Sequence, residues 1–98
     1  MVKKIIWNDS ALRTFDNITS YLQDNYSLQA AYNFSELAYN KIDQITKYPT
    51  IGRPVPNTKT LQKINFGKHH QLYFRLKGRT LYICDFFDTR QDPTKRPY

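Results

Sequence analysis

The chain has 98 residues, enough for one domain with one hydrophobic core and too few for two. Apolar residues make up 40% of it and aromatic residues 15%, which excludes a disordered chain and suits a small core of large rings. The formal net charge of +7 is uneven, because residues 1–58 carry six basic and five acidic side chains whereas residues 59–98 carry nine and three. Such a basic half favours an anionic partner (nucleic acid, a membrane surface or an acidic protein segment) over a role in solubility alone.

The single cysteine, Cys84, lies in an apolar run and has no partner for an intramolecular disulfide bond. The apolar stretch that follows the N-terminal lysines is too short for a signal peptide, and no run approaches the length of a membrane span. These features predict a cytoplasmic protein that is not embedded in a membrane. Metal-ligand spacings and nucleotide-binding glycine loops are both missing, so the sequence predicts neither a metal nor a cofactor.

The first predicted element is a β-strand over residues 2–7, which are mostly apolar and partly β-branched. Residues 8–10 are Asn, Asp and Ser, and all three residue types favour the position just before a helix. The apolar residues that follow recur at spacings of four, three and four, and predict a helix with one apolar face that ends near residue 24. This stripe consists of Ala11, Phe15, Ile18 and Leu22.

A second helix is predicted to begin after Ser27, another capping residue. It should end near Tyr48, because Pro49 disfavours helical backbone before it and has no N–H to donate. Its apolar stripe consists of Ala31, Phe34, Ala38, Ile42 and Ile45. Two helices joined by a short connection predict an antiparallel hairpin whose apolar faces need a sheet to cover. Residues 49–60, with three prolines and one glycine, are predicted to form a loop.

Three β-strands are predicted after this loop, over residues 61–66, 70–77 and 81–87. The first two alternate apolar and polar residues, and the third is apolar almost throughout, which is typical of an interior strand. Residues 77–79 predict a tight turn between the last two strands. We therefore expect a single α+β domain over residues 1–98 with the order β-α-α-β-β-β. Its helical hairpin packs on one face of a small, mainly antiparallel sheet, and residues 88–98 form a polar tail.

Alternation along these strands assigns side chains to the two faces of the sheet. The residues expected to face the helices are Ile64, Phe66, Leu72, Phe74 and Leu76. The helices cannot cover the opposite face, which is therefore open or half covered by the C-terminal tail. It receives Lys63, Asn65, Gln71, Tyr73 and Arg75, and Arg90 can overhang it. Cations beside an aromatic ring on an open sheet suit an RNA backbone and a stacked base, and the alternative is an ordinary solvated face.

Four side chains of this region each have a functional and a structural interpretation. Arg90 is suited by its guanidinium to bind phosphate, and its structural alternative is to pair with Asp88 or Asp92. Arg53 is expected to tie the loop to the sheet. His70 has the parity of the core and should pack there, whereas His69 has the parity of the open face and can act as an acid or base.

A further set of residues extends along nearly the whole chain. It comprises Trp7, Ala11, Leu12, Ile18, Tyr21, Leu22, Ala31, Phe34, Ile45, Tyr73, Phe74 and the run from Ile83 to Phe87. Its most specific parts are the Pro-x-x-Gly-Arg motif at residues 49–53 and the Arg-Gln-Asp-Pro motif at residues 90–93. In this order and spacing the residues resemble those of the RelE/ParE superfamily, the toxins of bacterial type II toxin–antitoxin systems.

The resemblance implies one of two activities. RelE-like members cleave messenger RNA in the ribosomal A site without a metal, whereas ParE-like members poison DNA gyrase and are not known as nucleases. Members of both kinds are masked by an antitoxin whose tail wraps the toxin. The implied partners are therefore a cognate antitoxin encoded next to this chain, with an acidic or amphipathic tail, and either gyrase or the ribosome with its messenger RNA.

Metal-free RNA cleavage needs a base for the 2′-hydroxyl, cations that stabilise the phosphorane and an acid for the leaving oxygen. By the resemblance, Lys63 matches the strand lysine of RelE-like members and Arg90 matches their late arginine. This match favours phosphate binding by Arg90 over pairing with an aspartate. The candidate catalytic residues are Lys63, Tyr73, Arg75 and Arg90, with Tyr98 and His69 as weaker candidates. The candidate nucleic-acid contacts are Lys63, Lys68, Arg75 and Arg90.

Two departures favour the ParE-like reading. Asn65 stands where RelE-like members often have a second lysine, and Gln71 stands where they often have an arginine. Stabilisation of the phosphorane would be weaker, unless Arg75 or Lys68 substitutes. The sequence thus predicts a growth-inhibiting gyrase poison that stabilises a plasmid or chromosome. An mRNA interferase is the alternative, a non-toxic basic nucleic-acid-binding module is the second alternative, and the question of enzymatic activity stays open.

Overall fold

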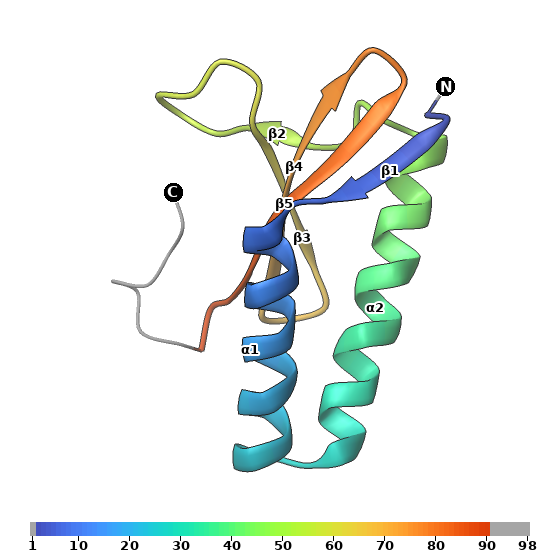
Figure 1. Ribbon diagram of the computed structural model, residues 1–98. Coiled ribbons are helices and arrows are strands. Elements are labelled where there is room, and N and C mark those ends of the chain that lie inside the picture. The colour runs from blue at the N-terminus through green and yellow to red at the C-terminus, as the bar shows by residue number, and fades with distance from the viewer. Residues whose placement is uncertain (1, 91–98) are drawn as a thin grey trace.

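Both predicted helices form where their apolar stripes place them, in a computed structural model that describes residues 2–90. α1 spans Asp9–Asn25 and α2 spans Leu28–Lys47. Ser27 caps α2 as predicted, because its Oγ accepts a hydrogen bond from the backbone N–H of Ala30 at 3.0 Å. Figure 1 shows the two helices side by side and antiparallel. Neither helix of the described part is long and apolar enough to cross a membrane.

The strands form one five-stranded sheet in the order β1-β5-β4-β3-β2 (Figure 1). Their bounds are Lys4–Trp7 for β1, Arg53–Pro54 for β2, Gln62–Phe66 for β3, His70–Lys77 for β4 and Thr80–Asp88 for β5. β1 runs parallel to β5, and the other neighbouring pairs are antiparallel. Gly78, with a φ of 61°, lies in the tight turn between β4 and β5. The predicted α+β class with a mainly antiparallel sheet is confirmed.

β2 corrects the prediction that residues 49–60 are wholly loop. It pairs with β3, with Arg53 opposite Lys63 and Pro54 opposite Gln62. A proline is tolerated because β2 is an edge strand. A Cβ atom added at Gly52 would lie 2.5 Å from Cζ of Phe74, so the chain reaches this position beside the sheet only because residue 52 is glycine.

The main core lies between the helices and one face of the sheet. The Phe34 ring of α2 lies 5.9 Å from the Phe66 ring of β3 and 6.0 Å from the Phe86 ring of β5. All five strand residues that alternation assigned to the helix side contribute to this core, as predicted. Fully burying one such side chain contributes about 1.5–3 kcal/mol, which makes this face the main attachment of the helical hairpin.

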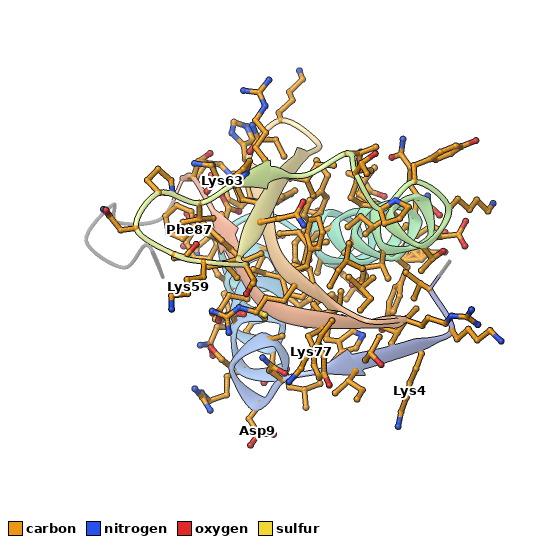
Figure 2. All side chains as sticks on the ribbon, turned by 90° about the horizontal axis from the view of Figure 1, so that it is seen from above. Lys4, Asp9, Lys59, Lys63, Lys77 and Phe87 are labelled. Carbon is orange, nitrogen blue, oxygen red and sulfur yellow. The ribbon has the colours of Figure 1, made fainter. Side chains whose placement is uncertain are left out.

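The opposite face, here called the polar face, is not open at its centre. Val55 and Leu61, which flank the loop after β2, pack there against Tyr73 of β4 and against Cys84 and Phe87 of β5. Figure 2 shows the loop passing beside Phe87. Only 1% of Tyr73 is exposed, so a base cannot stack on its ring as the open-platform hypothesis required.

Two side chains of α1 form hydrogen bonds with β5 beyond the end of β1. The backbone N–H of Phe86 donates to Oγ1 of Thr14 at 3.0 Å, and Oγ of Ser10 donates to Oδ1 of Asp85. The register of β4 against β5 shifts next to this point, between Tyr73 and Phe74, as in a β-bulge. The first turns of α1 thus occupy the part of the β5 edge that β1 leaves free.

Candidate functional site

Positive charge concentrates in the sheet and its loops. Residues 48–84 contain seven lysines and arginines and no acidic residue, whereas α1 and α2 together carry five acidic and three basic residues. The seven cations are Arg53, Lys59, Lys63, Lys68, Arg75, Lys77 and Arg79. An anionic partner is therefore attracted to the sheet side of the molecule rather than to the helices.

A row of four side chains crosses the polar face. Arg53, Lys63, Tyr73 and Asp85 stand directly opposite one another on β2, β3, β4 and β5. Residues directly opposite across strands share a face, and like charges in such a pair repel each other. Within residues 2–90, neither Arg53 nor Lys63 is paired with a carboxylate. The two adjacent cations are therefore suited to an anion that bridges them.

The row ends in a hollow of about 420 Å³, here called the Lys63 hollow. Its lining consists of Ile51, Arg53, Lys63, Ile64, Asn65 and Gln71. The Tyr73 hydroxyl donates to Oε1 of Gln71 at 3.0 Å, which leaves the amide N–H groups of Gln71 to donate elsewhere. Two cations and two amides supply hydrogen-bond donors, and this set fits the oxygens of a phosphate or carboxylate.

A second hollow of about 460 Å³, here called the Lys77 hollow, lies farther along β4. Its lining consists of Asn8, Thr60, Arg75, Leu76, Lys77 and Tyr82. Arg75 and Lys77 are two residues apart on β4, so their side chains leave the same face. Figure 2 shows Lys63 and Lys77 well separated from each other. Basic side chains of the described residues on the polar face therefore line two separate hollows.

Arg90 does not overhang the polar face. Its Nη2 donates to Oδ2 of Asp88 at 2.8 Å and its Nε donates to Oδ1 at 3.1 Å. Its Cζ lies 4.8 Å from the ring centroid of Tyr26, at the connection between α1 and α2. Alternation turns Phe87 toward the polar face and Asp88 toward the helices, so pairing with Asp88 draws Arg90 to the helix side.

Asp88 also lies beside His70, which is packed in the main core as its parity predicted. His70 is 8% exposed, and its ring centroid lies 4.7 Å from that of Phe34. Burial lowers the pKa of His70 to about 4, although the charge of Asp88 acts in the opposite direction. Burial raises the pKa of Asp88, but hydrogen bonds from Arg90 outweigh it and the net shift is downward. At neutral pH His70 is neutral and Asp88 is ionised.

The structure separates the residues that the sequence nominated together. Lys63 lines one hollow and Arg75 the other, Tyr73 is buried between the strands and the loop, and Arg90 lies at the helix connection. Among the described residues, neither Lys68 nor His69 lines either hollow. Tyr98 lies outside the described residues.

Among the lining residues that carry a charge or an aromatic ring, sequence reasoning did not nominate three as site residues. Arg53 was missed as a partner of Lys63 because a two-residue strand leaves no periodic signal. Lys77 and Tyr82 have the parity of the polar face, so alternation offered a signal for both. Within residues 2–90, no group of three or more His, Cys, Asp or Glu residues is arranged to hold a metal ion.

Comparison with known proteins assigns the chain to a family. Residues 5–93 match the model of the family described as "ParE toxin of type II toxin-antitoxin system, parDE". The comparison with curated protein sequences found no match. Among the solved structures that match is one described as "Chromosomal ParDE TA system from P. aeruginosa". It aligns with a TM-score of 0.75 at 14% identity, covering 89% of this chain and 96% of that chain, and therefore bears on the fold alone. The chain belongs to the ParE toxin family of type II toxin–antitoxin systems, within the RelE/ParE superfamily.

Proposed function

We propose that this chain is a cytoplasmic, growth-inhibiting toxin that acts by binding DNA gyrase. Membership of the ParE family supports the toxin role. The observation that favours protein binding over RNA cleavage is the separation of Lys63, Arg75 and Arg90 among three places. Stabilising a phosphorane requires cations that converge on one phosphate, and these three do not converge.

We further propose a cognate antitoxin with an acidic or amphipathic tail. The outer face of the helices exposes four large apolar side chains, Leu12, Leu28, Tyr32 and Tyr39, each more than half exposed. An amphipathic helix can cover such residues, and an acidic segment can reach the basic sheet side. An antitoxin that used both surfaces would mask most of the toxin, which suits the role of a neutraliser.

Cleavage of messenger RNA is the second candidate function, and one observation favours it. Arg53 stands beside Lys63 and supplies the second cation that Asn65 and Gln71 do not. In this reading Arg53 and Lys63 stabilise the phosphorane in the Lys63 hollow. The base and the acid would have to come from other residues.

Induced expression in bacteria without the antitoxin tests both candidates. Messenger RNA 5′ ends are mapped after induction, and the purified chain is added to gyrase in a DNA supercoiling assay. Growth arrest with intact messages and inhibited supercoiling supports the gyrase proposal. New cuts within translated codons would instead support the ribonuclease and contradict the gyrase target. A culture that grows normally would contradict the toxin role, provided that the chain is produced and folded.

A further inference from the structure

The Lys77 hollow is not explained by the proposed function. It crosses the sheet from Asn8, just after β1, over Tyr82 of β5 and the β4 residues Arg75 and Lys77, to Thr60 before β3. None of the roles proposed above requires this arrangement. Its volume of about 460 Å³ lies within the range of small-ligand sites.

Two cations form the charged side of the Lys77 hollow. Arg75 and Lys77 are both exposed and leave the same face of β4. Within the described part of the chain, neither is engaged in a salt bridge. A guanidinium and an ammonium side by side are well suited to the oxygens of a phosphodiester group.

An aromatic ring lies next to these cations. Tyr82 stands directly opposite Arg75 across β4 and β5. The ring packs against the smaller cluster around Tyr73 and also lines the hollow, so it is partly buried and held in place. A fixed aromatic ring beside cations is the combination on which single-stranded nucleic acids stack their bases.

Thr60 and Asn8 add polar groups at two ends of the lining. A hydroxyl and an amide can each donate and accept hydrogen bonds, so they suit the polar edge of a base or sugar. An acidic peptide would use the two cations but would leave the aromatic ring without a specific role. The combination therefore favours a nucleotide over a carboxylate.

We propose that the Lys77 hollow binds one nucleotide of a single-stranded nucleic acid, with its base against Tyr82 and its phosphodiester group against Arg75 and Lys77. A duplex keeps its bases paired and stacked inside, so it cannot place a base in the hollow. This site is separate from the Lys63 hollow and does not depend on gyrase being the target.

Fluorescence anisotropy with the purified full-length chain tests the proposal. The probes are fluorescein-labelled ten-residue oligonucleotides of deoxythymidine and of uridine, a DNA duplex of the same length and a polyglutamate peptide, each at 50 and 200 mM NaCl. We expect both single strands to bind more tightly than the duplex and the peptide, and to weaken as salt rises. A preference between the two single strands identifies DNA or RNA as the source of the nucleotide, and either supports the site.

Matched variants distinguish binding in the Lys77 hollow from attraction by the net positive charge of the protein. Lys77→Glu should weaken single-strand binding about tenfold or more, whereas Arg13→Glu on α1, with the same change in charge, should weaken it less than threefold. Tyr82→Leu should weaken it about tenfold, and Tyr82→Phe, which keeps the ring, should retain it. Tyr48→Leu, at an exposed ring beyond α2, is the control for losing a tyrosine.

Three results would overturn the proposal. Equal losses of single-strand affinity in Lys77→Glu and Arg13→Glu would show that the nucleic acid is attracted by net charge alone. Tighter binding of polyglutamate than of either oligonucleotide would assign the hollow to an acidic protein segment. If the folded Tyr82→Leu protein bound single strands as tightly as the unchanged protein, the base would not be stacked on Tyr82. Because gyrase is not in this assay, its outcome is independent of the gyrase proposal.

Discussion

The Arg90 guanidinium donates one hydrogen bond to each oxygen of the buried Asp88 carboxylate, at 2.8 Å and 3.1 Å. Asp88 is 0% exposed, and a buried charge is tolerated only when a partner compensates it. The same guanidinium lies over the Tyr26 ring, so one side chain connects the end of β5 to the turn between the helices. The contacts of Arg90 in this structure are those of an anchor within the fold.

Removing this anchor should destabilise the protein. We expect Arg90→Ala to lower the free energy of unfolding by about 3 kcal/mol, because it leaves the Asp88 charge buried and unpaired. Urea unfolding followed by circular dichroism measures this value. Adding Asp88→Asn to Arg90→Ala should recover much of the loss, since the unpaired charge is then gone. A loss below about 0.5 kcal/mol would show that the pair matters little to folding.

Stability should fall with acid between pH 6.5 and 4. The pKa of His70 is about 4 in the folded chain against 6.5 for a free histidine, so over this range the unfolded chain binds one proton more. The contribution of His70 is therefore full above pH 6.5 and is lost as the pH falls, by at most about 3 kcal/mol. Asp88, whose folded pKa is also depressed, extends the loss below pH 4.

A pH series of urea unfolding curves, with NMR titration of the histidine rings, checks this dependence. His70→Phe should flatten the slope between pH 4 and 6.5, whereas His69→Gln should leave the His70 contribution in place. A His70 ring that titrates near pH 6.5 in the folded chain would contradict the prediction.

Arg53 and Lys63 should repel each other. In a double-mutant cycle with Arg53→Gln and Lys63→Gln, we expect an unfavourable coupling of about 0.2–1 kcal/mol in 20 mM NaCl. Salt screens exposed charges, so the coupling should shrink in 500 mM NaCl. Thermal unfolding of the four proteins at both salt concentrations measures it. An attractive coupling would mean that the two cations do not face each other as the register places them.

Tyr73 distinguishes the two candidate functions. Tyr73→Phe removes only the hydroxyl bonded to Gln71 and should cost about 1 kcal/mol of stability. If the toxin acts by binding gyrase, growth arrest should be unchanged in this variant. Loss of arrest by a folded Tyr73→Phe protein, measured in induced cultures alongside its unfolding curve, would show that the phenol acts in the chemistry.

The helices and long strands are predictable from the sequence because their apolar residues repeat at the period of a helix or of a strand. Each repeat places the apolar side chains on one buried face and the polar ones on the exposed face. The two ends of α2 are predictable from other local signals, the capping side chain of Ser27 and the restricted backbone of Pro49. β2 is not predictable, because two residues are too short for any period. Its place depends on Gly52 and its close approach to Phe74, which is a tertiary contact.

The candidate site is less predictable than the fold. Alternation correctly places Lys63 and Arg75 on the polar face, but it cannot show that the loop residues Val55 and Leu61 cover Tyr73. Alternation also gives no prediction for side chains beyond the end of a strand. Beyond β5, the direction of Arg90 is decided by the need of Asp88 for a partner rather than by parity.

The uneven distribution of charge makes the molecule an electric dipole. Its helices are slightly negative and its sheet side strongly positive, because residues 48–84 contain seven cations and no acid. A polyanionic or acidic partner therefore exerts a torque on the protein while the two are still apart, and turns the sheet toward itself before contact. The protein is thus oriented while it diffuses toward its partner, and a larger share of collisions leads to binding. Salt therefore affects the association rate more than the lifetime of the complex.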